Sequence, residues 1–121
     1  YNFLEIKNQL KVLGCQFRSQ SDTEVLLLGW QKWGEELLEK INGIFSFAIW
    51  DHKKEELFLA RDHFGIKPLY YYFDQNKIIF SSEIKAILLH DIKKELDFES
   101  LNIFFRFLYI PAPKTALSVR L

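Results

Sequence analysis

Few residues in this sequence are of the types that carry out chemistry, and their spacing limits what that chemistry can be. Cys15 is the single cysteine, which excludes an internal disulfide and a multi-cysteine metal site. It follows Gly14 at the predicted end of a helix, and its nitrogen is tied up in a peptide bond. We therefore interpret Cys15 as a small, partly buried core residue. The histidines have no mutual spacing typical of a metal site or a proton relay, and surface positions are expected for all three: His52, His63 and His90.

The acidic segment 21–24 (SDTE) is the first candidate site. Ser21 and Glu24 have the spacing of a capping box, and either Ser21 or Asp22 could cap the helix that begins here. From spacing alone, a helix cap is the favoured interpretation of Asp22. Ser21 and Thr23 are interpreted as structural.

Helical periodicity surrounds this segment. Residues on one face predict a first helix with Asn2 as N-cap and Gly14 as its stop: Phe3, Ile6, Leu10 and Leu13. An extended piece is predicted over 15–18. A second helix follows from 21–24, with an apolar stripe of Leu26, Trp30 and Trp33, and helical structure continues over 35–41 after Gly34.

The pattern then changes to strands. Residues 44–50 have no polar face, which is typical of a strand covered on both sides, and 56–61 read as its partner across a charged turn. A second hairpin is predicted from 69–73 and 77–81, and a short helix over 83–90. Asp97 should cap a last helix with four inward residues: Leu101, Phe104, Phe105 and Leu108. Residues 110–113 (IPAP) read as an extended exit.

The order of helices, antiparallel hairpins and helices predicts an α+β fold with at least one sheet stacked between layers. Apolar residues make up 49% of the 121 residues and aromatic residues 17%, which is ample for a packed core. The net charge is zero, which gives no electrostatic reason to propose nucleic acid or an anionic membrane as partner. No apolar run approaches the ~20 residues that span a bilayer. The single cysteine favours a reducing, cytoplasmic setting.

The sequence has no Met and begins at Tyr1 inside a structured-looking segment, so we expect both ends to be cut. Four stretches resemble the glutamine-dependent asparagine synthetases, in that family's order. They are 1–5 (YNFLE) with 21–25 (SDTEV); 42–51 (NGIFSFAIWD); 59–71 (LARDHFGIKPLYY); and 81–86 (SSEIKA) with 109–115 (YIPAPKT). The third is similar to class II glutamine amidotransferases in general, whereas the Pro-Ala-Pro segment favours the asparagine synthetases.

The resemblance implies a glutaminase domain of the N-terminal-nucleophile hydrolase type, an αββα sandwich of antiparallel sheets that is incomplete in this chain. Residues 1–109 would be the C-terminal part of the domain, and 110–121 the exit segment toward a synthetase domain of the same polypeptide. The family's nucleophile is a Cys at the mature N-terminus, activated by its own α-amino group. We expect that Cys upstream of Tyr1, so this chain has no catalytic residue of its own and is inactive alone.

The resemblance also gives Asp22 a function, since the acid of this motif in the family binds the α-ammonium of substrate glutamine. This reverses the preference for a helix cap, although both roles can coexist. The family's oxyanion hole and carboxylate clamp would also precede Tyr1. ATP and Mg are expected in the synthetase domain, with no metal site in this chain. A homodimer is a further candidate assembly.

Arg61 and Asp62 end a strand before the loop that contains Gly65 and Pro68. One interpretation places them toward the synthetase domain, near the route of ammonia. The favoured one is structural: an internal ion pair, or hydrogen bonds that brace the loop.

Two other functions remain open. One is a related amidotransferase that feeds ammonia to another acceptor, such as a sugar in polysaccharide synthesis. The other is a non-catalytic, amidotransferase-like module that keeps the fold without the chemistry.

Overall fold

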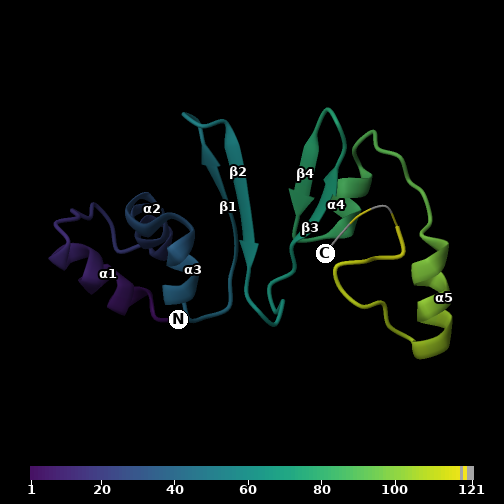
Figure 1. Ribbon diagram of the computed structural model, residues 1–121, viewed down its shortest axis with the longest axis horizontal. Helices are drawn as coiled ribbons and strands as arrows, with labels where there is room; N and C mark the ends of the chain where they lie inside the picture. Colours follow the sequence, from purple (N-terminus) through teal and green to yellow (C-terminus); the bar gives the residue numbers. More distant parts are fainter. Residues whose placement is uncertain (118, 120–121) are drawn as a thin grey trace. The chain divides into compact units, whose positions relative to one another are not determined.

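The computed structural model describes residues 1–117 and 119. The chain divides into two compact units, Tyr1–Leu59 and Ala60–Leu121, and each unit is described by itself (Figure 1). No helix in the described part of the chain combines the length and the hydropathy needed to cross a membrane.

The first unit begins with helices in the predicted order: α1 (Phe3–Val12), α2 (Asp22–Trp33), the 3-10 turn η1 (Gly34–Glu36) and α3 (Leu37–Lys40). Gly14 follows α1 with φ of +86°, a left-handed conformation that glycine adopts without strain, so its role as a stop is confirmed. Asn2 stands before α1, but its side chain does not cap the helix. Asn2 is therefore the N-cap by position, as predicted, but its side chain bonds to the backbone of Lys40 and Asn42.

The core of this unit lies where α1 packs on α2 and α3. Its buried residues are Ile6, Leu10, Val25 and Leu37, and Cys15 is half-buried against them. Gly29 lets α3 approach closely, because a Cβ atom there would lie 2.8 Å from Cδ1 of Leu37. Leu13, predicted on the buried face, is exposed because the helix has already ended at Val12.

A two-stranded sheet follows, made of β1 (Ser46–Asp51) and β2 (Glu56–Arg61). Asp51 shapes the turn between them by accepting hydrogen bonds from the backbone N–H groups of Lys53 and Lys54. The prediction that both faces of β1 are covered is wrong for this structure. Ile49 is buried, but Trp50 on the other face is 56% exposed, since the described residues supply no layer over it.

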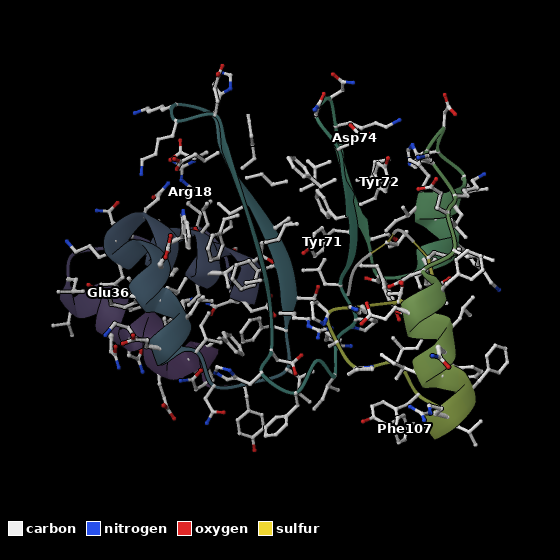
Figure 2. All side chains as sticks on the ribbon, turned by 45° about the vertical axis from the view of Figure 1, so that its right-hand side comes forward. Arg18, Glu36, Tyr71, Tyr72, Asp74 and Phe107 are labelled. Atoms are coloured by element: carbon white, nitrogen blue, oxygen red, sulfur yellow. The ribbon has the colours of Figure 1, made fainter. Side chains whose placement is uncertain are left out.

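The second unit contains the predicted second hairpin, β3 (Tyr70–Phe73) and β4 (Ile78–Ser81), which pair antiparallel. Figure 2 shows Asp74 at the tip of this hairpin, where its carboxylate accepts the N–H groups of Asn76 and Lys77. The short helix α4 (Ile84–Leu88) packs against the hairpin. The core of this unit contains three buried residues: Tyr72, Ile87 and Val119.

The last helix is α5 (Phe98–Phe107), and Asp97 caps it as predicted. The predicted inward face is wrong, because Phe105 is 77% and Leu108 78% exposed, whereas Ser100 is the fully buried residue. The segment that follows the helix returns to its start, where the N–H of Asp97 donates to the carbonyl of Ala116 and Leu96 bridges to Leu117. Ser100 lies near this end of the helix, where its hydroxyl donates to the carboxylate of Asp97 at 2.6 Å.

Residues 110–113 do not leave in an extended conformation. The N–H of Lys114 donates to the carbonyl of Pro111, which closes a turn, and the chain then runs back to residues 96–97. The predicted domain limits, 1–109 and 110–121, remain a prediction.

The fold class is α+β, as the sequence predicts. Each sheet among the described residues has two strands, β1 with β2 and β3 with β4. The stacked αββα sandwich therefore stays an expectation of the resemblance.

Candidate functional site

The start of α2 presents the candidate ligand-binding carboxylate. Ser21 is the N-cap, in an extended conformation, and its hydroxyl accepts the N–H of Thr23 at 3.1 Å. Asp22 is the first helical residue and is exposed. Its Oδ1 accepts the Thr23 N–H at 2.8 Å. The choice between the two capping residues is thus settled for Ser21, and Asp22 presents its carboxylate to solvent in the first turn of the helix.

Glu24 does not complete the predicted capping box. Its two carboxylate oxygens instead accept the N–H of Arg18 at 2.8 Å, the N–H of Ser19 at 2.8 Å and the Ser19 hydroxyl at 2.6 Å. These hydrogen bonds, led by the one from Arg18, lower the pKa of the Glu24 carboxyl below its ordinary value of 4.5. Glu24 therefore holds the loop that precedes α2 rather than the N-cap residue.

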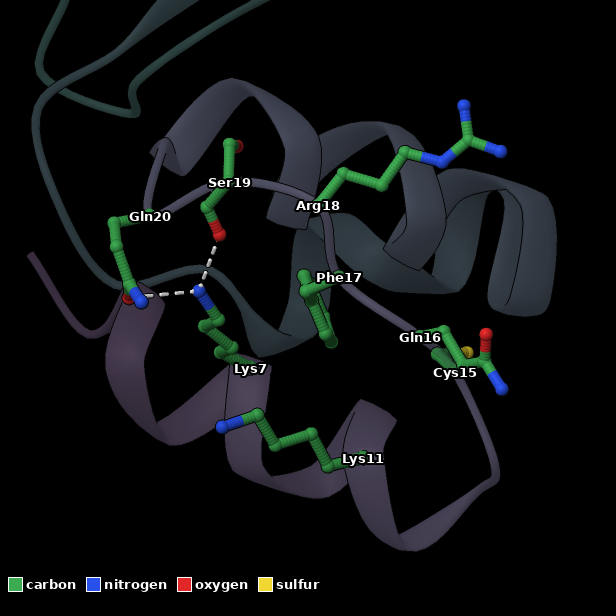
Figure 3. Close-up of a pocket in the computed structure, with 8 residues that line it drawn as sticks. All are labelled: Lys7, Lys11, Cys15, Gln16, Phe17, Arg18, Ser19 and Gln20. Carbon is green, nitrogen blue, oxygen red and sulfur yellow. Dashed lines mark hydrogen bonds between the residues drawn. The ribbon is translucent and has the colours of Figure 1, made fainter.

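Lys7 holds the same loop from α1. Although it is a lysine, only 4% of it is exposed. Its ammonium donates to the carbonyl of Ser19 at 2.8 Å and to Oε1 of Gln20 at 3.0 Å, and it lies 4.9 Å from the centroid of the Phe17 ring (Figure 3). The sequence prediction missed Lys7. Its only signal is a position three residues before Leu10, on the buried side of the helix.

An open hollow of about 540 Å³ lies between α1 and the 15–20 loop. Basic side chains line it, but Figure 3 shows those of Lys11 and Arg18 pointing in different directions, so they do not converge on one ligand. Asp22 is not part of its lining. The hollow is therefore a separate feature from the exposed carboxylate.

The other candidate chemical groups do not gather. Cys15 is a free, half-buried thiol that packs against the first core, as its interpretation predicted. All three histidines are exposed: His52, His63 and His90. Among residues 1–117 and 119, no three His, Cys, Asp or Glu side chains form a group that could hold a metal ion.

Asp62 is buried in the second unit and closes the loop that follows β2. Its Oδ1 accepts the N–H of Ile66 at 2.9 Å, and its Oδ2 accepts the N–H of Lys67 at 3.0 Å. The guanidinium of Arg61 lies beside Gly65, where a Cβ atom would come within 3.1–3.2 Å of it. For Asp62 this is the loop-bracing arrangement of the structural interpretation. Nη1 of Arg61 is buried and has no hydrogen-bond partner among the described residues, so a bracing role for Arg61 stays a prediction, as does a contact of either residue with another domain.

The comparison with known proteins agrees with these motifs. Residues 1–119 match the family described as the glutamine amidotransferase domain. The chain is 45% identical to asparagine synthetase [glutamine-hydrolyzing] 3 of Bacillus subtilis (strain 168) over 87% of its own length and 17% of the relative. It is 39% identical to asparagine synthetase [glutamine-hydrolyzing] 1 of the same organism, over 95% of this chain and 18% of the relative.

A putative asparagine synthetase [glutamine-hydrolyzing] 2 of Methanocaldococcus jannaschii is 38% identical over 93% of this chain and 22% of its own length. The chain thus spans about a fifth of the length of the curated relatives that it matches. Since the family match extends over residues 1–119, this chain belongs to the glutamine amidotransferase domain family.

Proposed function

We propose that this chain is the glutamine-binding part of the glutaminase domain of a glutamine-hydrolysing asparagine synthetase. The match of residues 1–119 to the amidotransferase domain carries the proposal. The names of the similar proteins, together with the small fraction of their length that this chain spans, support a longer polypeptide. In it, glutamine is hydrolysed here and ammonia passes to a synthetase domain that makes asparagine from aspartate.

The proposed role of Asp22 is to bind the α-ammonium of glutamine. Oδ1 is occupied by the N–H of Thr23, and Oδ2 accepts no hydrogen bond from the residues that the structure describes. An exposed carboxylate with one such oxygen can form a charge-assisted hydrogen bond to an ammonium group, which contributes about 1.5–3 kcal/mol. The contact would select a free amino acid over a glutamine side chain within a protein.

The remaining groups for the reaction would come from elsewhere in the polypeptide. We propose that the nucleophilic cysteine, the oxyanion donors and the carboxylate clamp precede Tyr1, and that this chain alone does not hydrolyse glutamine. ATP and Mg would bind the synthetase domain. We also propose that the complete domain has the αββα sandwich fold. The full-length protein would be cytoplasmic and would form a homodimer. Light scattering on the purified full-length protein measures the assembly.

Replacing Asp22 tests the proposal in the full-length protein. Asp22→Ala should raise the KM for glutamine by about 10- to 100-fold, because one charge-assisted contact is lost. Asparagine synthesis supported by ammonium chloride should keep its rate, since that reaction needs no bound glutamine. Unchanged use of glutamine by Asp22→Ala would contradict the role of this residue.

The product identifies the acceptor. With glutamine, aspartate and ATP, the proposal expects asparagine in proportion to the glutamate released. Glutamate without asparagine would favour an amidotransferase with another acceptor, and neither product would favour the non-catalytic module.

A further inference from the structure

We infer that Lys7 and Glu24 are positioning residues that fix the direction of the Asp22 carboxylate, an inference that rests on the glutamine-binding role proposed above. Neither side chain is placed to bind the substrate itself. The ammonium of Lys7 is directed at the loop that precedes α2, and the carboxylate of Glu24 is directed at the same loop.

The two charged residues meet at Ser19 and use all of its polar groups. Glu24 accepts the N–H and the hydroxyl of Ser19, while Lys7 donates to the Ser19 carbonyl. One group comes from α1 and the other from α2, so the loop is held from both helices. A residue bonded through its N–H, hydroxyl and carbonyl has little freedom to rotate about its backbone.

This clamp is connected directly to the start of α2. The N–H of Ser21 donates to the Ser19 hydroxyl at 3.2 Å, and the hydroxyl of Ser21 in turn accepts the N–H of Thr23. Asp22 lies between these two bonded residues. The conformation of Ser19 therefore sets the direction in which the chain enters the helix, and with it the direction of the first helical side chain.

The burial of Lys7 supports a specific role. Burial of an ammonium group is unfavourable unless acceptors replace its water, and lysine is among the residues least often buried. Here the carbonyl of Ser19, the amide of Gln20 and the ring of Phe17 replace the water. An apolar residue could fill the same space for packing alone, but it could not hold Ser19 through its carbonyl.

The test compares two lysines of α1 in the full-length protein. Lys7→Met should raise the KM for glutamine by about tenfold and change kcat by less than about twofold, because a misdirected Asp22 weakens binding of the ground state and the transition state equally. Lys7→Arg should restore most of the affinity. Lys11→Met removes the same charge from the same helix and hollow, and should leave KM unchanged.

Two further variants separate positioning from stability. Leu10→Ala opens a cavity in the core beneath α1 and leaves the hydrogen bonds of Ser19 in place. This variant should therefore have a lower melting temperature but an unchanged KM for glutamine. Glu24→Gln weakens the clamp from the exposed side and should raise KM by about threefold, which keeps the inference testable if Lys7→Met does not fold. An equal rise of KM in Leu10→Ala would overturn the inference.

A double-variant cycle distinguishes this inference from the proposed function. If Asp22 is the group that is positioned, Lys7→Met should have little further effect on KM in an Asp22→Ala background. An effect of Asp22→Ala without any effect of Lys7→Met or Glu24→Gln would overturn the positioning role and leave the glutamine-binding role standing. No effect of Asp22→Ala would contradict the glutamine-binding role.

Discussion

Asn2 and Asn42 form a reciprocal pair although they lie 40 residues apart. The N–H of Asn2 donates to the carbonyl of Asn42 at 3.2 Å, and the N–H of Asn42 donates to Oδ1 of Asn2 at 2.9 Å. The side-chain nitrogen of Asn2 also donates to the carbonyl of Lys40 at 2.9 Å. The start of α1 is thereby joined to the end of α3 and to the turn that leads into β1.

Asn2→Ala should therefore lower the stability of the first unit. The change removes two hydrogen bonds made by the side chain, and at about 1 kcal/mol each the expected loss is about 1–2 kcal/mol. Urea unfolding followed by circular dichroism measures the loss. Asn8→Ala is the matched control, because Asn8 is exposed on α1. The free energy of unfolding of this variant should not fall.

Ser21 and Asp22 should be separable by substitution. Ser21→Ala removes the hydroxyl that caps α2 and should lower the melting temperature by about 5 °C, and because the same hydroxyl helps to position Asp22, the KM for glutamine should rise slightly. Asp22→Ala should raise the KM for glutamine far more and change the melting temperature less. Differential scanning fluorimetry combined with glutaminase kinetics on the full-length protein measures both effects. If both variants changed the melting temperature alone, Asp22 would be a structural residue.

Asp62→Ala should be the most damaging of these substitutions. It removes two part-buried hydrogen bonds to a charged acceptor, from the N–H groups of Ile66 and Lys67, at an expected cost of about 3 kcal/mol. Equilibrium unfolding measures the loss. Asp91→Ala removes an exposed carboxylate from the same unit and should have little effect on stability. Equal losses in the two variants would argue against the bracing role.

Acid should weaken the start of α5. The hydrogen bond from the Ser100 hydroxyl, with the N–H bond of the same residue, lowers the pKa of Asp97 below its ordinary value of 3.8. The unfolded chain therefore takes up this proton first as the pH falls. The stabilisation is fully present above the unfolded pKa and is lost as the pH falls through the lower folded value.

Melting temperatures measured from about pH 5 to about pH 2 test this linkage. Asp97→Asn can still cap the helix but has no proton to gain, so its melting temperature should fall less steeply than that of the unchanged protein. Parallel curves for the two proteins would mean that Asp97 contributes nothing to the acid sensitivity.

Local signals predicted most of the elements. Gly14 ends α1, Asp97 caps α5, and Asp74 shapes the turn of the second hairpin. Each of these residues acts within a few positions of its own place in the chain, so these features could be predicted from the sequence. Glu24 also has the right spacing for a local bond. The predicted bond from Glu24 to the N–H of Ser21 does not form, because the carboxylate accepts the N–H groups of Arg18 and Ser19 on the other side of the N-cap.

Long-range partners could not be predicted. Periodicity indicates which residues share a helix face, but not which face is covered. The apolar side of α5 was therefore expected inside, whereas the buried residue of this helix is Ser100, whose hydroxyl donates to the carboxylate of Asp97. Lys7 was missed for a related reason, because its acceptors at 19–20 belong to a loop rather than to a repeating pattern. The position of Asp22 followed from sequence, and its substrate contact remains a prediction.

The half-buried Cys15 gives the isolated chain a built-in chemical reporter. It is the only thiol in the 121 residues, and it lies at the base of the 15–20 loop, with its N–H bonded to the carbonyl of Leu10. Its alkylation rate should depend on how often that loop opens. Labelling with a small iodoacetamide can therefore follow loosening of the loop in Lys7 and Glu24 variants without adding any foreign probe.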